Sequence, residues 1–295
     1  THFSPGFGKG SMVYNVIDTR QSYTQKIVVQ GLRVLGFSEH AEKSIHFSYE
    51  MVALSPRSLK ELDFEISAED KDKSFLEVSG RKGLGVKADD LIDRMEKKAA
   101  VEVVKRNPEL SPETCQEISR NIAVGALRYF MLKFSRNSMI VFDFEEALSF
   151  EGETGPYLQY TLVRINSIFR KLGEKERFRQ EDLEKLIKMR RLFLESLLPE
   201  EQDDFWELVF YALQAEEEVL HSIQSLEFSI LAKFAFNVSQ KFNNYYHKYS
   251  ILSEPDSDIK NTRILIISFI RDVLSRTLSL MGIPQPEKIC LLYTS

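Results

Sequence analysis

The chain has 295 residues and a formal net charge of −5, with 43% hydrophobic and 28% charged residues. This composition is typical of globular proteins, and the length suits one large domain or two ordinary ones. No apolar run reaches the length of a membrane span, and Cys115 and Cys290 offer neither a disulfide framework nor a zinc spacing. We therefore expect a cytoplasmic protein that is not associated with a membrane.

The first third of the chain has the pattern of a parallel α/β layer. Val13–Ile17 and Phe75–Val78 are predicted strands, and His46–Leu54 is a third. Apolar residues recur at helical spacing over Tyr23–Leu35, where Gly36 ends the helix. Strand, helix and strand in succession predict a parallel sheet.

From Ala88 onward the pattern becomes helical. Asp89–Arg106 forms one predicted helix, and Ser111-Pro112 opens the next with proline at the first helical position. Ser138–Phe144 is a short strand or an extended link. Long periodic segments then follow, which predict an α-helical bundle over residues 157–172, 180–197, 203–225, 227–250 and 258–281.

Charge is distributed unevenly along the chain. Residues 120–140 contain four cations and no acid, whereas residues 201–227 contain eight acids and no Lys or Arg. The basic segment is compatible with the local electrostatic footprint of a nucleic-acid binder. For each segment taken alone, a solvated helix face is the simpler interpretation.

Polar residues cluster where the first strand ends and the first helix begins. Asp18 and Gln21 lie there, and ligands of α/β sheets bind outside the carboxyl ends of the strands. These two side chains suit a cationic or amide group. The alternative is that Asp18 caps the helix.

A glycine-rich loop follows the predicted strand Phe75–Val78. Ser79, Arg81 and Lys82 lie in it, among small residues that let a ligand approach the backbone. Such cations suit a polyphosphate whose negative charge grows in a transition state. A solvated basic turn is the alternative.

Aromatic residues alternate with polar and basic ones in two helical segments. Tyr157 and Tyr160 share a helix face beside Arg164, and Tyr246 lies in the stretch Phe242–Tyr249. Aromatic and guanidinium groups stack on unpaired bases. Core packing is the alternative reading of these tyrosines. The five histidines are scattered without ligand spacing, so no metal site is expected.

The joint order of these segments resembles bacterial-type arginyl-tRNA synthetases, which are class I aminoacyl-tRNA synthetases. The stretch Phe-Glu-Gly-Glu-Thr-Gly-Pro-Tyr-Leu-Gln-Tyr over Phe150–Tyr160 is the most specific segment. Tyr14–Gln21, Ile45–Val52, Val78–Asp93, Asn121–Arg136 and Ile264–Met281 add to it. The chain is thus similar to the C-terminal portion of these enzymes.

The resemblance implies residue roles. Gln21 and Asp18 match the arginine pocket, and His46, Met51 and Val52 match the ATP-binding strand. Ser79, Arg81 and Lys82 match positions in the catalytic loop of class I synthetases that is known as the KMSKS loop. For tRNA binding, the matching positions are Tyr157, Tyr160, Arg164, Tyr246 and Met281.

The resemblance also implies a fold and a reaction. The fold is mainly α: residues 1–148 form the C-terminal part of a Rossmann-type α/β catalytic domain, and residues 149–295 form a helical, DALR-type anticodon-binding domain. The enzyme ligates arginine to tRNA-Arg through arginyl-adenylate, with ATP as substrate, Mg²⁺ accompanying it and no tightly bound cofactor.

Two expectations concern the chain itself. The His-x-Gly-His signature of class I synthetases is absent from its 295 residues. We therefore expect a fragment that lacks the first half of the catalytic site. We also expect a monomer. The alternative is a stand-alone tRNA-binding module without catalytic activity.

Overall fold

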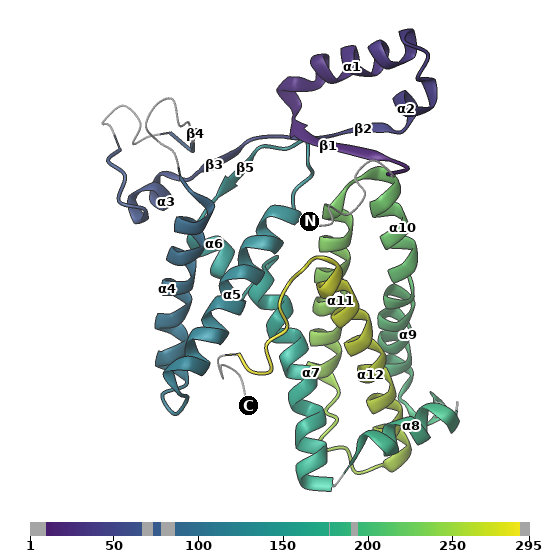
Figure 1. Cartoon of the computed structure of the whole chain (residues 1–295). Helices are drawn as coiled ribbons and strands as arrows, with labels where there is room; N and C mark the ends of the chain where they lie inside the picture. Colours follow the sequence, from purple (N-terminus) through teal and green to yellow (C-terminus); the bar gives the residue numbers. More distant parts are fainter. Residues whose placement is uncertain (1–9, 67–72, 78–85, 177, 190–193, 290–295) are drawn as a thin grey trace, which may run out of the picture.

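The computed structural model describes residues 10–66, 73–77, 86–176, 178–189 and 194–289, and these are mainly helical. Figure 1 shows two small sheets at one end of the molecule and a bundle of long helices below them. The mainly α class expected from the sequence is confirmed.

The first sheet contains two parallel strands, β1 (Val13–Asp18) and β2 (Ser44–Tyr49). Between them come the short 3-10 helix η1 (Thr19–Gln21), α1 (Ser22–Val34) and α2 (Ser38–Glu42). Gly36, at φ +86°, supplies the left-handed conformation that ends the α1 turn. The predicted strand–helix–parallel strand is confirmed, although α1 buries no residue.

The predicted strand at 46–54 is wrong in one respect, because it is two strands in two sheets. β3 (Val52–Leu54) pairs in parallel with β5 (Ile140–Phe142) and antiparallel with β4 (Leu76–Glu77). The change of partner occurs at Glu50–Met51. The Glu50 N–H donates to the Arg136 carbonyl (2.8 Å), and the Met51 carbonyl accepts from the Ile140 N–H (3.2 Å).

Four helices pack around the second sheet: α3 (Pro56–Glu61), α4 (Ala88–Arg106), α5 (Pro112–Leu132) and α6 (Phe144–Leu148). Ser111 caps α5 by accepting from the Thr114 N–H, with Pro112 in the first turn, as the sequence predicts. Phe130, Phe142 and Phe144 form edge-on aromatic pairs in the core below this sheet.

The bundle follows in chain order. Its helices are α7 (Gly155–Glu176), α8 (Gln180–Met189), η3 (Leu194–Ser196), α9 (Pro199–Leu213), α10 (Ala215–Ser225), α11 (Phe228–Lys248) and α12 (Ser257–Leu280). The segment predicted as one helix at 203–225 is therefore divided at Gln214, and within the segment predicted at 180–197 the structure describes α8 and η3. In the described part of the chain, no helix is both long and apolar enough to cross a bilayer.

Helix α5 contributes to both cores of the molecule. Tyr129 is fully buried in the bundle core, where its hydroxyl donates to the Ala232 carbonyl of α11 (3.3 Å). The next residue, Phe130, is buried in the core of the second sheet. Burial raises the pKa of the Tyr129 hydroxyl well above its usual range, so it remains a neutral donor.

Glycines bring α5 and α7 into close contact. A Cβ added to Gly155 would lie 2.2 Å from the Gly125 carbonyl oxygen, and one added to Gly125 would lie 2.5 Å from the Gln159 amide. Gln159 is buried and donates from Nε2 to the carbonyls of Asn121 (2.9 Å) and Pro284 (2.8 Å). This amide ties α7 to α5 and to the chain after α12.

Candidate functional site

A cluster of aromatic and polar side chains connects α7 to α11. Tyr157, Tyr160 and Arg164 are three or four residues apart on α7, so they share one helix face. Asn243 and Tyr246, three apart on α11, face them. All five are partly buried, which leaves part of each side chain accessible to solvent.

Arg164 is at the centre of this cluster. Its guanidinium donates to Asn243 Oδ1 (2.6 Å) and to the Tyr160 hydroxyl (2.8 Å). Its Cζ atom lies 4.7 Å from the centre of the Tyr160 ring and 5.8 Å from that of Tyr246. These distances fall in the range of cation–π attraction. The charge is held by neutral groups, and no ion pair of Arg164 occurs among the described residues.

Asn243 extends the cluster to Tyr157. Its Nδ2 donates to the Tyr157 hydroxyl (3.0 Å) and to Thr161 Oγ1 (2.9 Å). The Tyr157 ring packs against Phe236 with 5.6 Å between centroids. Asn243 was not predicted as a site residue, although it lies in the same stretch as Tyr246, Phe242–Tyr249.

The structure thus brings four of the five predicted tRNA-binding residues together. Met281 differs from them, because it is buried in the bundle core at the end of α12. A buried side chain presents little surface to a ligand. The tRNA-binding role of all five residues stays a prediction.

A second set of predicted residues lies around the carboxyl ends of β1 and β2. In the parallel register Asp18 pairs with Tyr49, so both strands end at the same edge. Asp18 accepts from the Arg20 N–H (2.7 Å) and side chain (2.9 and 2.8 Å). These bonds lower the pKa of Asp18 to about 2, which keeps the carboxylate ionised at neutral pH. The expected capping role is present as well, since Asp18 caps η1.

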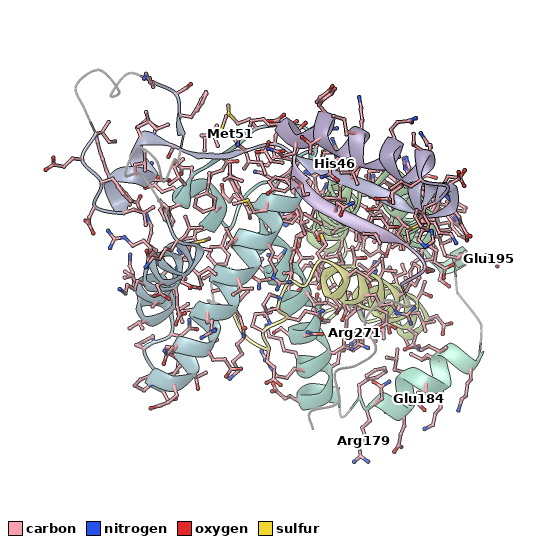
Figure 2. The ribbon with its side chains drawn as sticks, turned by 45° about the horizontal axis from the view of Figure 1, so that its top comes forward. His46, Met51, Arg179, Glu184, Glu195 and Arg271 are labelled. Carbon is pink, nitrogen blue, oxygen red and sulfur yellow. The ribbon has the colours of Figure 1, made fainter. Side chains whose placement is uncertain are left out.

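The remaining residues of this set differ in position. Gln21 is exposed at the start of α1. His46 Nε2 donates to the Ile17 carbonyl (2.9 Å), which joins β2 to β1. Figure 2 shows His46 on β2 beneath α1, with Met51 on the link toward β3. Met51 is partly buried and Val52 is exposed. Ser79, Arg81 and Lys82 lie outside the described residues.

A cavity of about 350 Å³ lies between α4, α5, α6 and the segment that follows α6. It is lined by Lys98, Ala99, Glu102, Ile122, Glu145, Leu148, Ser149 and Phe150. Each of its charged side chains already has an ion-pair partner: Lys98 with Glu61, Glu102 with Arg106, and Glu145 with Arg57. The cavity therefore offers no unpaired charge to a ligand.

The basic segment 120–140 and the acidic segment 201–227 differ in how their charged side chains are paired and buried. In the basic one, Lys133 pairs with Glu146 (2.6 Å) and Arg136 with Glu227 (3.3 Å), while Arg120 and Arg128 are exposed. In the acidic one, Glu201 is buried and paired with Arg263. Helix α11 lies between α7 and the acidic α9–α10 pair (Figure 1). The α7 residues of the aromatic cluster and the acidic surface thus lie on different sides of α11.

Comparison with known proteins identifies relatives along almost the whole chain. Residues 158–289 match the family described as the DALR anticodon binding domain. The arginine–tRNA ligase of Thermus thermophilus is 33% identical over 286 residues, which are 95% of this chain and 42% of the relative. That of Pyrococcus furiosus is 32% identical over 288 residues, 97% of this chain and 41% of the relative.

Solved structures agree with these matches. The arginyl-tRNA synthetase of Thermus thermophilus superposes with a TM-score of 0.74 at 28% identity, covering 95% of this chain and 42% of that one. The Plasmodium falciparum enzyme, at 20% identity and a TM-score of 0.69, shows the same fold over 95% of this chain and 41% of its own. The chain therefore spans less than half the length of the relatives it matches.

Proposed function

We propose that the helical bundle binds the anticodon loop of tRNA-Arg, since this chain carries a DALR anticodon binding domain and is related to the C-terminal part of the arginyl-tRNA synthetases. The whole enzyme would be an arginine–tRNA ligase, and this chain would bind the anticodon. A cytoplasmic location and a monomeric state go with this proposal.

One observation carries the proposal: Arg164 lies between the rings of Tyr160 and Tyr246, with Tyr157 joined to them through Asn243. Every nucleobase has a π-face, so a pre-ordered group of aromatic rings stacks loop bases at small entropic cost. The guanidinium adds a positive charge that attracts the phosphate backbone. Single-stranded loops are the RNA elements that proteins recognise in this way.

The test compares two tyrosines of the same bundle. Replacing Tyr157 with alanine should weaken binding of a tRNA-Arg transcript by about 1–3 kcal/mol, the usual contribution of one stacked base. Tyr249→Ala should change it little, because the Tyr249 hydroxyl donates to Asp204 (2.9 Å) and its ring packs on Tyr245. Filter binding at one fixed salt concentration measures both affinities.

A conservative variant separates stacking from folding. Tyr157→Phe keeps the ring and loses only the hydroxyl that accepts from Asn243, so it should bind tRNA nearly as the unaltered chain does. Thermal melting of all three variants identifies any loss of the folded state. Equal losses of affinity in Tyr157→Ala and Tyr249→Ala, at equal melting temperatures, would reject the assignment.

We further infer that the β1–β2 edge forms part of a site for arginine and for ATP with its Mg²⁺. The support is that Asp18 is ionised and that both strands end at one edge, close to Gln21 and the link toward Met51. An anionic carboxylate suits the guanidinium of arginine, which would have to take the place of the Arg20 guanidinium that now pairs with Asp18. Ser79, Arg81 and Lys82 are proposed to stabilise the departing pyrophosphate, and His46 and Val52 to line the adenosine side.

A further inference from the structure

Helices α9 and α10 run end to end along the outer side of the bundle, packed on α11 (Figure 1). Gln214 alone separates them, and its φ of −72° and ψ of −2° remain right-handed. The two helices thus form one nearly continuous rod over residues 199–225, about 40 Å long at 1.5 Å per residue.

This rod has two apolar faces. One is buried against the bundle and includes Phe205, Leu208 and Ala212. The other faces solvent, and its large side chains are 38% to 59% exposed: Trp206, Phe210, Leu213, Leu220 and Ile223. Trp206 and Phe210 stack on each other at 5.1 Å. A helix that packs on one neighbour needs only one apolar stripe, so the outer stripe calls for a second partner.

The spacing of the outer stripe is that of a coiled-coil seam. Trp206, Phe210, Leu213, Glu217 and Leu220 follow one another at intervals of four, three, four and three residues. This alternation keeps one side of a helix against a second helix over several turns. Glu217 occupies one seam position, and a polar seam residue selects a partner with a complementary group.

The charges that α9–α10 themselves carry are all of one sign. Residues 199–225 contain no Lys or Arg. Lys241 and Lys248 of α11 pair with Glu207 and Asp204. The exposed acids Asp203, Glu216 and Glu217 form no ion pair among the residues that the structure describes. The outer face is therefore apolar along its centre and anionic along its edges.

We propose that the outer stripe of α9–α10 docks an amphipathic helix of a partner protein, with an apolar seam, basic flanks and one Lys or Arg opposite Glu217. The acidic edges repel RNA phosphates and anionic lipid headgroups. They also disfavour a second copy of this chain, because two such rods would bring acidic edges together, and the neighbouring Lys241 and Lys248 already pair with Glu207 and Asp204 of their own copy. A cationic helix satisfies both the seam and its edges.

A synthetic peptide tests the proposal on the complete chain. The probe is a helical peptide of about three heptads with leucine at its seam, one lysine at the seam position opposite Glu217, and lysine on its flanks. The control peptide has glutamate in place of lysine. Trp206 is the only tryptophan of the chain, so its fluorescence reports binding at the stripe itself. The lysine peptide should saturate this signal, and its affinity should fall as salt rises, whereas the glutamate peptide should leave the signal unchanged.

Matched variants localise the effect. Leu213→Glu with Leu220→Glu should lower the affinity about tenfold or more, as truncating the centre of an interface does. Leu280→Glu, at a similarly exposed apolar position of α12, should leave it unchanged. Because each site is exposed, all variants should melt as the unaltered chain does. Glu217→Lys should weaken binding of the lysine peptide and so reduce the difference between the two peptides, since the other acids of α9–α10 remain.

Four results would overturn the proposal. They are equal binding of the two peptides, no binding of either, a Trp206 response to phosphatidylserine vesicles, and a concentration-dependent dimer that Leu220→Glu abolishes. The last two would assign the stripe to a membrane surface or to a second copy of this chain. None of these results depends on tRNA binding, so each proposal can be rejected without rejecting the other.

Discussion

Arg263 and Glu201 form an ion pair in the bundle interior, where their side chains are 8% and 2% exposed. The guanidinium donates to both carboxylate oxygens of Glu201 (2.7 Å each) and also to Glu254 and the Ser250 carbonyl. The Tyr245 hydroxyl donates to Glu201 (2.9 Å). Together they hold the start of α9 to α11 and α12.

Removing one partner of this pair should be more harmful than removing both. Arg263→Met leaves a buried carboxylate uncompensated and should lower the free energy of unfolding by about 3–5 kcal/mol. The double variant Glu201→Met with Arg263→Met should be more stable than Arg263→Met, because the buried Glu201 carboxylate is gone, while Glu254 loses Arg263 in both variants. Urea denaturation of the chain measures both. A double variant that is less stable than the single one would show that the pair is not acting through its buried charge.

Glu201 also shows a limit of reading residues from sequence. It belongs to an acidic run whose simplest interpretation is a solvated helix face, and most of that run is solvent-accessible. Its partner Arg263 is 62 residues away in the chain, so no local pattern reveals the pair. Asn243 was missed for the same reason, since its hydrogen bonds run to Tyr157, Thr161 and Arg164 on another helix.

At the scale of the elements, the close contact of α5 and α7 at Gly125 and Gly155 predicts the effect of one substitution. Gly155→Ala would place a methyl group 2.2 Å from the Gly125 carbonyl oxygen, which is backbone and cannot rotate away. The helices must separate, at a cost of about 1–3 kcal/mol or more. Differential scanning calorimetry should show a lower melting temperature.

Gly31→Ala is the matched control, because Gly31 lies inside α1 and nothing is within 4 Å of its added Cβ. Alanine is the better helix former there by up to about 1 kcal/mol. The chain should therefore become slightly more stable. A loss of stability at Gly31 equal to that at Gly155 would mean that helix contact does not explain the effect.

Elements set by local chemistry could be predicted, and those set by distant partners could not. The cap at Ser111-Pro112 and the stop at Gly36 act within a few residues, and both helix ends agree with the structure. The run 46–54 was read as one strand because its composition is continuous. Its division at Glu50–Met51 depends on β5 and Arg136, which are far away in sequence.

The same limit applies to the candidate site. Helical spacing alone placed Tyr157, Tyr160 and Arg164 on one face, and the structure confirms that arrangement. Tyr246 comes from α11, and only the packing of α7 on α11 brings it to Arg164. The division of the chain at residue 148 stays a prediction, as do the roles of the residues at the β1–β2 edge.

At the scale of the whole molecule, we expect tRNA binding without the first chemical step. The chain spans 42% of its Thermus thermophilus relative and contains no His-x-Gly-His segment. Arginine-dependent exchange of pyrophosphate into ATP should therefore stay at the background level, with the Thermus thermophilus enzyme as positive control. Exchange above background that Lys82→Ala removes would show a catalytically complete chain.

Helix α5 has a mechanical consequence for the whole molecule. Its neighbouring residues Tyr129 and Phe130 are anchored in different cores, one in the bundle and one under the second sheet. A rotation of α5 that suits one core must displace a fully packed ring in the other. Helix α5 therefore couples the two cores. A displacement of the bundle at α7 or α11 is transmitted to the second sheet through this one helix, because no loop separates Tyr129 from Phe130.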